Sequence, residues 1–421
     1  MINQSILLVE PENIEENLYP FSVMHCGWEI RMGAFRKYEK MEKEFPGASI
    51  LYYTKREKHL RSFLKRVHSD QQTLEDNDLL VLKTNALHSR HFWDNIKNAL
   101  RNHQTPQPIL FKNGEDPAAA FIPKSELARR SDFKQFAVLS NFSNEFYANF
   151  ITENITIKPI NYLWNTLDYV EESIEYDFHF FENEFDYGLA YQQGWHICNE
   201  KEIVIGEGSK IAPGVVLDAT DGPIIIGKNV RVMANAVIIG PCFIGDNSII
   251  KIGAKIYEKT AIGEWCKVGG EIENSIIHGY SNKQHDGFLG HSYLGEWVNL
   301  GADTNTSDLK NTYGKISAIL RDREVDSDRM FLGLMAGDHT KSGINTMFTT
   351  GTVAGVSSNV VGAGYPPRSI PSFSFGGFKE SPVYEFSKAI DVAKTVMARR
   401  KKELLPEEEA LLKMEFERLA T

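Results

Sequence analysis

The sequence has few of the features that mark secreted, membrane-spanning or nucleic-acid-binding proteins. Its 421 residues include only four cysteines, and no two of them form a Cys-x-x-Cys pair. A disulfide framework or a thiolate zinc site is therefore not expected, and a reducing cytoplasm fits best. No stretch approaches the roughly 20 apolar residues of a membrane-spanning helix. Because the N-terminus lacks a basic region and a long apolar run, we expect no signal peptide or anchor.

Positive charge is also in the minority. The chain has 46 basic and 56 acidic side chains, and its formal net charge is −10. Because such a field repels polyanions, we do not expect nucleic acid as a partner. The hydrophobic fraction of 42% is that of a globular protein, and the length favours two domains.

Residues 1 to about 195 carry alternating strand and helix patterns. The apolar runs that predict strands are Ser5–Val9, Ala48–Tyr53, Leu79–Leu82 and Pro108–Phe111. The helical patterns between them are Gly33–Phe45, Glu57–Val67 and Ser89–Arg101. Alternation at this spacing predicts an α/β domain around a mostly parallel sheet.

After Trp195 the pattern changes to a repeat of six residues. The branched apolar anchors are Ile226, Val232, Ile238, Ile244, Ile250, Ile256, Ile262 and Val268, and a small or apolar residue follows each after four positions. The same frame begins earlier, at Ile205, and returns at Leu294 and over 336–360. A period of six is typical of a parallel β-helix, in which three hexads close one triangular coil. We predict this solenoid over about residues 200–370.

The six-residue repeat is interrupted twice, and it is followed by a C-terminal tail of different sequence pattern. The register breaks over 274–293 and over 303–331, where we expect loops to leave the wall and carry chemistry. In the tail, Pro382 and Pro406 each predict a helix start, and we expect these helices to cap or buttress the solenoid. The basic run Arg399–Lys402 either binds an anion or forms a solvated face.

Residues of about 200–375 resemble the left-handed β-helix of hexapeptide-repeat acyltransferases. The segments GGEIENSIIHGYSNKQHDGFLG, LGEWVNLGADTNTSDLK and MAGDHTKSGIN are similar to those of sugar-1-phosphate nucleotidyltransferases with a C-terminal acetyltransferase. In detail the chain resembles an alternate bacterial branch of the bifunctional N-acetylglucosamine-1-phosphate uridyltransferase/glucosamine-1-phosphate acetyltransferase family. That branch has a segment like Asn17–Lys40 in place of the usual Gly-rich loop. The resemblance implies a Rossmann-like nucleotidyltransferase domain over 1–195, a β-helix acyltransferase domain over 196–378 and a helical tail over 379–421.

Acetyl transfer needs a base of near-neutral pKa, for which histidine is the usual choice. Three histidines lie in the first break, namely His278, His285 and His291. By the resemblance, HDGFLG aligns with the segment that opens with the family's catalytic histidine, so His285 is the expected base and His291 the alternative. The other interpretation is that all three are loop or surface histidines. A metal site is not favoured, because no carboxylate pattern accompanies them.

The resemblance also implies the binding residues around this base. The segment NLGAD places Asn299 near the sugar and the backbone of Ala302 near the thioester of acetyl-CoA, where an N–H would stabilise an oxyanion. Gly343 would line the arm of the coenzyme, and Arg368 would meet its phosphates. These residues are equally well explained as ordinary coil and terminal-loop positions.

Several positions depart from the family pattern. The family's sugar-phosphate Arg falls on Tyr257, its Lys on Glu273, its substrate Tyr on Phe288 and an Asn on Asp308. A carboxylate at position 273 would repel a phosphate. The candidates to supply the missing positive charge are Lys255, Lys259, Lys283 and Lys310.

Nucleotidyl transfer needs positive groups or backbone amides around the phosphates, and carboxylates for Mg²⁺. The candidates for phosphate contact, predicted to follow a strand and open a helix, are Arg31, Gly33, Arg36 and Lys37. The metal-holding Asp implied by the resemblance falls on Asn85. Asp168 and Asp177 are candidate Mg²⁺ ligands or plain surface carboxylates.

The leading hypothesis is a cytoplasmic, homotrimeric transferase of nucleotide-sugar synthesis of the UDP-N-acetylglucosamine type. Its substrates would be acetyl-CoA, a sugar phosphate and a nucleoside triphosphate, for which we expect UTP. One alternative is nucleotidyl transfer alone, with the β-helix as a trimerisation scaffold. The other is a non-catalytic nucleotide-sugar binding protein, which Asn85 and Glu273 favour.

Overall fold

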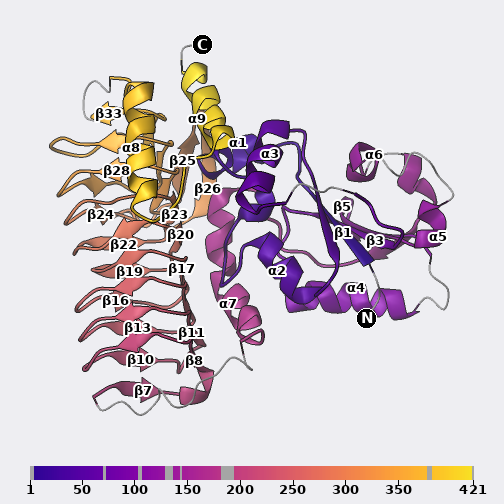
Figure 1. Ribbon diagram of the computed structural model, residues 1–421, viewed down its shortest axis with the longest axis horizontal. Coiled ribbons are helices and arrows are strands. Elements are labelled where there is room, and N and C mark those ends of the chain that lie inside the picture. Colours follow the sequence, from indigo (N-terminus) through magenta and orange to yellow (C-terminus); the bar gives the residue numbers. More distant parts are fainter. Residues whose placement is uncertain are drawn as a thin grey trace. The chain divides into compact units, whose positions relative to one another are not determined.

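The computed structural model describes residues 4–69, 73–102, 107–128, 136–142, 145–181, 194–376 and 382–419. The chain forms two compact units (Figure 1). The first comprises Met1–Glu15, His25–Ile30 and Phe35–Asn161, and the second comprises Glu16–Met24, Arg31–Ala34 and Tyr162–Thr421. The second unit thus takes in chain that the sequence assigned to the first domain, because α7 (Val170–Phe178) packs on solenoid strands.

The first unit is an α/β domain around one six-stranded sheet of order β2-β1-β3-β5-β4-β6. Its strands are β1 (Gln4–Val9), β2 (Ser49–Tyr53), β3 (Asp78–Lys83), β4 (Ile109–Asn113), β5 (Asp116–Ile122) and β6 (Ile151–Asn154). β1 pairs in parallel with β2 and β3, and β5 runs antiparallel to its neighbours β3 and β4. The four predicted strands are confirmed as β1 to β4.

The helices of this unit also follow the predicted patterns. They are α2 (Lys37–Glu44), α3 (Glu57–Arg66), α4 (Arg90–Asn102), α5 (Lys124–Leu127) and α6 (Phe136–Ser140), while α1 (Ile14–Asn17) lies where the two units divide. The prediction that a helix begins at Gly33 is wrong. Arg36 is the N-cap of α2, and its backbone N–H donates to the Glu39 carboxylate at 2.7 Å. The preceding Arg31–Ala34 belongs to the second unit.

The second unit is dominated by a parallel β-solenoid with three faces, as the stacked strands in Figure 1 show. Face 1 holds β7 (His196–Cys198), β10 (Val216–Asp218), β13 (Val237–Ile239), β16 (Lys255–Ile256), β19 (Glu271–Glu273) and β22 (Phe288–Gly290), followed by β24 (Asn305–Thr306) and β29 (Met347–Phe348). Face 2 holds β8 (Ile203–Ile205), β11 (Ile224–Ile226), β14 (Cys242–Ile244), β17 (Thr260–Ile262), β20 (Ile276–Gly279), β23 (Tyr293–Glu296), β27 (Leu334–Ala336), β30 (Thr352–Ala354) and β32 (Ser369–Ile370). Face 3 holds β9 (Lys210–Ile211), β12 (Arg231–Val232), β15 (Ile249–Ile250), β18 (Lys267–Val268) and β21 (Asn282–Lys283), and continues through Asn299 to β28 (Lys341–Ser342), β31 (Asn359–Val360) and β33 (Phe375–Gly376).

The hexad anchors form the core of the solenoid, which confirms the predicted fold. The eight anchors from Ile226 to Val268 are at most 1% exposed. Val232 pairs with Ile250 and Ile244 pairs with Ile262, so one coil takes 18 residues, or three hexads. Each anchor therefore lies against its counterpart one coil away and removes a branched side chain from water.

The two register breaks have different structural causes. At the first, Ile262 pairs with Ile277 and Val268 with Lys283, so this coil is 15 residues long instead of 18. The wall continues there, and the prediction that a loop leaves it is wrong. At the second, the antiparallel hairpin of β25 (Ile316–Leu320) and β26 (Arg323–Arg329) leaves the coil, as predicted.

The C-terminal helices pack near the end of the solenoid. They are α8 (Phe386–Ala398) and α9 (Pro406–Arg418), so Pro406 opens a helix as predicted whereas Pro382 precedes α8 by four residues. Ile390, Ala393 and Met397 of α8 are buried. Within the described residues, no helix is both long and apolar enough to cross a membrane.

Candidate functional site

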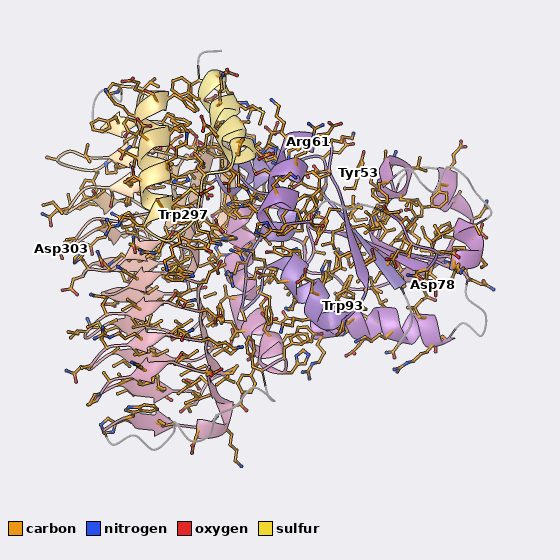
Figure 2. The ribbon with its side chains drawn as sticks, viewed as in Figure 1. Tyr53, Arg61, Asp78, Trp93, Trp297 and Asp303 are labelled. Atoms are coloured by element: carbon orange, nitrogen blue, oxygen red, sulfur yellow. The ribbon has the colours of Figure 1, made fainter. Side chains whose placement is uncertain are left out.

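A cavity of about 600 Å³ in the first unit lies where three parallel strands end. It is lined by residues that end or follow β1, β2 and β3, among them Glu10, Thr54, Arg56 and Lys83. In open α/β sheets, ligands bind outside the carboxyl ends of the parallel strands. The topology therefore makes this cavity the candidate nucleotide site, and Figure 2 labels Tyr53 at the end of β2.

A buried carboxylate organises this cavity. Glu10 accepts hydrogen bonds from Nε and Nη2 of Arg56 at 2.9 and 2.5 Å, and from the backbone N–H of Gly27 at 2.7 Å. The Thr54 hydroxyl donates to the same carboxylate. The Glu10 carboxylate is thus occupied by hydrogen bonds from the protein, and it holds Arg56 and Thr54 in place at one edge of the site.

Sequence reasoning missed the cations that line this cavity, which are Lys55, Arg56 and Lys83. Lys83 ends β3, and its ammonium lies 5.1 Å from the ring centroid of Phe142. Partial burial lowers the pKa of Lys83 from its usual range. In the part of the chain that the structure describes, no carboxylate lies within ion-pair distance of Lys83. The available signal was a lysine closing the apolar strand run LLVLK.

Asn85 lies in the turn that follows β3. Its carbonyl accepts a hydrogen bond from the backbone N–H of Ile160 at 2.7 Å. The buried Lys37 ammonium donates to the carbonyls of Thr84 and Ala86 on either side. Burial holds the pKa of Lys37 well below its usual range. Lys37 therefore braces this turn, and its predicted contact with phosphate stays a prediction.

Two more of the residues predicted to bind nucleotide, Arg31 and Gly33, belong to the second unit and contact other residues of it. Arg31 is 2% exposed, and its Nη2 lies 2.9 Å from Oε2 of Glu264. Its guanidinium also lies 5.5 Å from the ring centroid of Phe243. A Cβ at Gly33 would come within 2.5 Å of the Asp177 carboxylate, so Gly33 serves close packing. These contacts give Arg31 and Gly33 a packing role, and their phosphate-binding role stays a prediction.

The two predicted Mg²⁺ ligands each contact a donor within the second unit. Asp168 forms an ion pair with Arg329 at the end of the hairpin. Asp177 is 1% exposed and accepts a hydrogen bond from the backbone N–H of Ala34 at 2.9 Å. Each carboxylate thus has one contact with a donor of the fold, and a role in Mg²⁺ binding stays a prediction.

On the solenoid, three of the predicted acyl-transfer residues lie on one edge, the 3–1 corner formed by the turns from face 3 to face 1. His285, Ala302 and Gly343 lie in the turns of three successive coils. The N–H of Asp303 donates to the carbonyl of Asp286 at 3.1 Å, and that of Asn345 donates to Ala302 at 2.8 Å. Figure 2 shows Asp303 at the outer edge of the solenoid. His285 is exposed at this corner, where a substrate can reach it.

Lys283 occupies an interior position next to this corner. It is 1% exposed, and its ammonium donates to the carbonyls of His285 and Asp286 at 2.6 and 3.1 Å and to that of Gly269 at 3.3 Å. Burial lowers the pKa of Lys283 to about 8, while Asp286 and Asp303 act in the opposite direction. The ammonium of Lys283 is thus enclosed by backbone carbonyls of the turn, and its predicted contact with substrate stays a prediction.

A second group lies at the 1–2 corner, where face 1 turns into face 2. Tyr257, Glu273, His291 and Asp308 follow one another there in successive coils. Nδ1 of His291 lies 2.7 Å from Oδ2 of Asp308, and the imidazole stacks on Phe331 with ring centroids 4.9 Å apart. A carboxylate that fixes an imidazole in this way is the arrangement of an oriented general base.

Glu273 also belongs to this corner group. Burial raises its pKa, and the negative charges of Asp308, Glu258 and Glu271 raise it further, while His291 lowers it. The corner therefore concentrates carboxylates rather than the positive charge that a phosphate needs.

The remaining predicted residues lie elsewhere. The ammonium of Lys310 donates to the carbonyl of Lys315 at 2.6 Å, near the hairpin. Arg368, immediately before β32, donates to the Ser317 hydroxyl at 3.0 Å and pairs with Glu324. The structure therefore does not bring Arg368 to the 3–1 corner. Asn299 is exposed on face 3, where its Oδ1 accepts a hydrogen bond from Asn282 at 3.3 Å.

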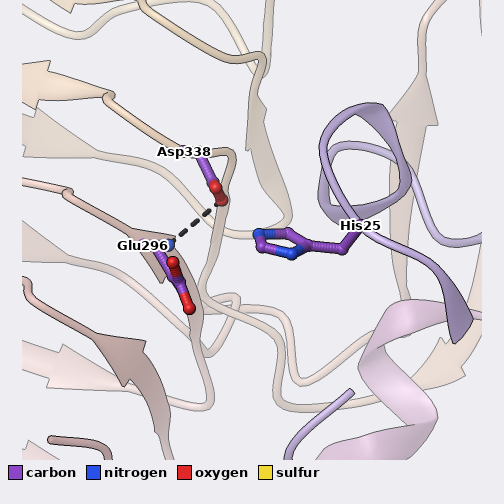
Figure 3. A group of neighbouring side chains, drawn as sticks. All are labelled: His25, Glu296 and Asp338. Carbon is purple, nitrogen blue, oxygen red and sulfur yellow. Dashed lines mark hydrogen bonds between the residues drawn. The ribbon is translucent and has the colours of Figure 1, made fainter. Parts of the chain in front are cut away.

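The third histidine of the first break, His278, is buried on face 2. Its Nδ1 lies 3.1 Å from Oε1 of Glu296, and its ring lies 5.5 Å from that of Phe21. The backbone N–H of Glu296 donates to Oδ1 of Asp338 at 3.0 Å, the dashed line in Figure 3. The three histidines thus occupy three different sides of the coil, which their spacing in sequence could not reveal.

Comparisons with known proteins agree with this architecture. Residues 6–185 match the sugar nucleotidyl transferase family. The bifunctional protein GlmU of Rippkaea orientalis is 31% identical over 150 residues, which cover 34% of this chain and 27% of that protein. GlmU of Ruthia magnifica subsp. Calyptogena magnifica is 26% identical over 270 residues, or 63% of this chain and 51% of that protein. The chain thus spans about half or less of the length of these relatives.

Among solved structures, UDP-N-acetylglucosamine acyltransferase from Campylobacter jejuni aligns at 12% identity and a TM-score of 0.29. That alignment covers 53% of this chain and 92% of the other. Residues 6–185 are thus similar to the sugar nucleotidyl transferase family, and parts of the chain are distantly similar to the bifunctional GlmU proteins.

Proposed function

We propose that the protein is a bifunctional enzyme of nucleotide-sugar synthesis. Its α/β unit transfers a nucleotidyl group to a sugar 1-phosphate, and its solenoid transfers an acetyl group from acetyl-CoA to a sugar phosphate. The observation that carries the proposal is the sugar nucleotidyl transferase match of residues 6–185, because that segment also holds the cavity at the carboxyl ends of the strands. We further propose UTP as the nucleotide, a homotrimer as the assembly and the cytoplasm as the compartment, where four free cysteines fit.

In the nucleotidyl reaction, an oxygen of the sugar phosphate attacks the α-phosphorus of the nucleotide, and pyrophosphate leaves. Positioning and positive charge supply most of the catalysis in such transfers. Lys55, Arg56 and Lys83 line the cavity and would contact the triphosphate. Glu10 would hold Arg56 in place, since it accepts two hydrogen bonds from that guanidinium. Mg²⁺ binding by Asp168 and Asp177 stays a prediction, and no step is assigned to them.

In the acetyl reaction, the acceptor attacks the thioester carbon while a base removes its proton, and the thiolate of the coenzyme leaves. His285 is the base that we propose, since it is exposed in the same row of turns as Ala302 and Gly343. A backbone N–H at Ala302 would stabilise the negative oxygen of the intermediate. The turn at Gly343 would lie along the arm of the coenzyme, and Asn299 would contact the sugar.

A second candidate base is His291. The specific observation in its favour is the 2.7 Å contact with Asp308, which orients the imidazole. His285 and His291 lie at different corners of the same coil, so substitutions can separate them.

Two assays test the proposal on the full chain. One follows consumption of acetyl-CoA with hexosamine phosphates, and the other follows pyrophosphate release from UTP with sugar 1-phosphates. His285→Ala should lower acetyl transfer by about 10²–10⁴-fold, as expected for loss of a general base, and leave pyrophosphate release unchanged. His196→Ala, at an exposed histidine of β7, is the matched control. If His291→Ala and Asp308→Asn lose most acetyl transfer while His285→Ala loses none, His291 is the general base instead of His285.

For the nucleotidyl site, Lys83→Gln should lower pyrophosphate release and leave acetyl transfer unchanged. Lys58→Gln, at an exposed lysine of α3, is its control. Absence of both activities in the native chain, across UTP and the other nucleoside triphosphates, would contradict the proposed function.

A further inference from the structure

A second cavity, of about 300 Å³, lies between face 3 of the solenoid and the C-terminal end of α8. Lys267 of β18 and Lys341 of β28 line it from the solenoid, and Arg399 and Arg400 line it from the helix end. All of these residues belong to the second unit. Neither the family resemblance nor the proposed reactions assign a role to this group of four cations.

The positive charge of this cavity is not balanced within the fold. Among the described residues, none of the four cations forms an ion pair with a carboxylate. Burial lowers the pKa of Lys267, and the charges of Arg400 and Arg399 lower it further. Four mutually repelling cations around one small cavity are relieved by an anion of high charge density.

The cations come from two separate elements, the solenoid wall and the end of α8. An effect confined to one element therefore cannot explain why all four are present. Basic residues at a helix C-terminus are favoured by the helix dipole, and this accounts for Arg399 and Arg400 alone. Lys267 and Lys341 are contributed by the wall, where no such dipole acts. Lys341 uses one N–H to donate to the carbonyl of His339 at 2.8 Å, and an ammonium has two more to offer.

Polar and aromatic groups complete the cavity. Asn282 lies between the two elements, and Nη2 of Arg400 lies 3.5 Å from its Oδ1. Tyr280 and Trp297 stack with ring centroids 4.4 Å apart and line the side next to face 2. Figure 2 labels Trp297 in the solenoid. These groups give the cavity a firm wall, because Trp297 is only 5% exposed.

We propose that this cavity binds the phosphate group of a phosphorylated substrate of the solenoid. The inference rests on the proposed acetyl transfer, since the cavity reaches Gln284, the neighbour of His285, and Asn299, the residue expected at the sugar. It also explains how a phosphate could bind although Tyr257 and Glu273 replace the positively charged residues of the family pattern. The phosphate charge is met on face 3 instead. Its source is either the sugar phosphate or coenzyme A, which share this chemistry.

Calorimetric titration of the full chain tests the site without relying on catalysis. The probes are inorganic pyrophosphate, glucosamine 1-phosphate and acetyl-CoA, each added to the native chain and to the double variant Lys267→Gln/Arg399→Gln. We expect the double variant to weaken binding of at least one probe by tenfold or more. Lys401→Gln is the matched control, because it removes a charge from the same basic run outside the cavity lining, and it should change affinity less than twofold. Thermal unfolding of each variant verifies that the fold is retained.

The arms of the experiment identify the source of the phosphate. A loss confined to glucosamine 1-phosphate assigns the cavity to the acceptor, and a loss confined to acetyl-CoA assigns it to the coenzyme. Unchanged affinity of the double variant for all three probes overturns the inference, as does an equal loss in Lys401→Gln. If the native chain lacks acetyl transfer but the double variant still loses phosphate binding, the proposed function fails and the site stands.

Discussion

At the scale of single residues, Lys283 carries the clearest physical signature. It occupies an interior position that Val268 fills one coil earlier, and its ammonium holds the turn of His285 through two backbone carbonyls. The solenoid therefore accepts a buried cation where an apolar residue would pack. A buried charge of this kind is retained at some expense of stability and fixes a local structure.

This cation makes stability depend on pH in a defined direction. Burial lowers the pKa of Lys283 to about 8 in the folded chain, whereas an unfolded lysine keeps a value near 10.5. Below pH 8 the group is charged in both states, and between 8 and 10.5 the unfolded state binds more protons. The free energy of unfolding should therefore rise with pH relative to Lys283→Met, by about 2 kcal/mol between pH 8 and 10. Denaturant unfolding of both proteins at several pH values measures this, and parallel curves would contradict it.

Titration of Lys341 should make the affinity of the face 3 cavity for phosphate depend on pH. Burial lowers the pKa of Lys341 to about 8, and the groups that face it are Lys267, Arg399 and Arg400 together with the ring of Tyr280. Because Lys341 loses its charge as pH rises through this value, affinity for pyrophosphate should fall between pH 7 and 9. Calorimetry across this range checks the direction. In Lys341→Gln the fall should be smaller, and an undiminished fall would assign it to another group.

Gly33 shows how a residue expected at a nucleotide site also serves packing. A Cβ there would come 3.0 Å from the backbone of Ser173 and closer still to the carboxylate of Asp177. Gly33→Ala should therefore destabilise the protein by about 1–3 kcal/mol, the usual range for overpacking. Gly314→Ala is the control, since its Cβ would approach nothing nearer than 3.5 Å. Equal thermal midpoints for the two variants would contradict this assignment.

At the scale of elements, the solenoid could be predicted because each six-residue repeat forms one side of a coil from its own local sequence. Ile226 and its successors are buried at a fixed period, and no distant residue is needed to specify it. The 15-residue coil could not be recognised, since shortened turns move Ile277 and Lys283 out of the six-residue frame while the wall continues. The phosphate cavity could not be recognised either, because it requires β18, β28 and α8 to meet.

The helix α8 permits a test at this scale. Ala393 is 1% exposed, so Ala393→Glu would bury a carboxylate without a partner and detach the helix. Because each coil of a solenoid contacts mainly its neighbours, the circular dichroism of the strands should persist while phosphate binding is lost. Thr395→Glu, on the exposed side of α8, is the matched control and should retain binding. Full retention of pyrophosphate affinity in Ala393→Glu would exclude α8 from the site.

At the scale of the whole molecule, the proposed trimer makes a simple prediction. Light scattering of the purified chain should give three times the mass of one chain. Mixing two impaired chains, His285→Ala and Asn299→Ala, should restore acetyl transfer only if the two residues of one acetyl site come from different chains. A monomeric mass would contradict the assembly.

The second unit is also assembled from separate parts of the sequence, and this limits how the protein can be divided. Glu16–Met24 and Arg31–Ala34 lie in the unit of the solenoid, where Phe21 covers His278 and Tyr293 and Arg31 pairs with Glu264. A fragment that begins at residue 196 would keep every coil but lose these strips and uncover the aromatic surface beneath them. A solenoid fragment cut at residue 196 is therefore not a complete folding unit. An exchange of the solenoid would also have to include Glu16–Met24 and Arg31–Ala34, which belong to the same unit.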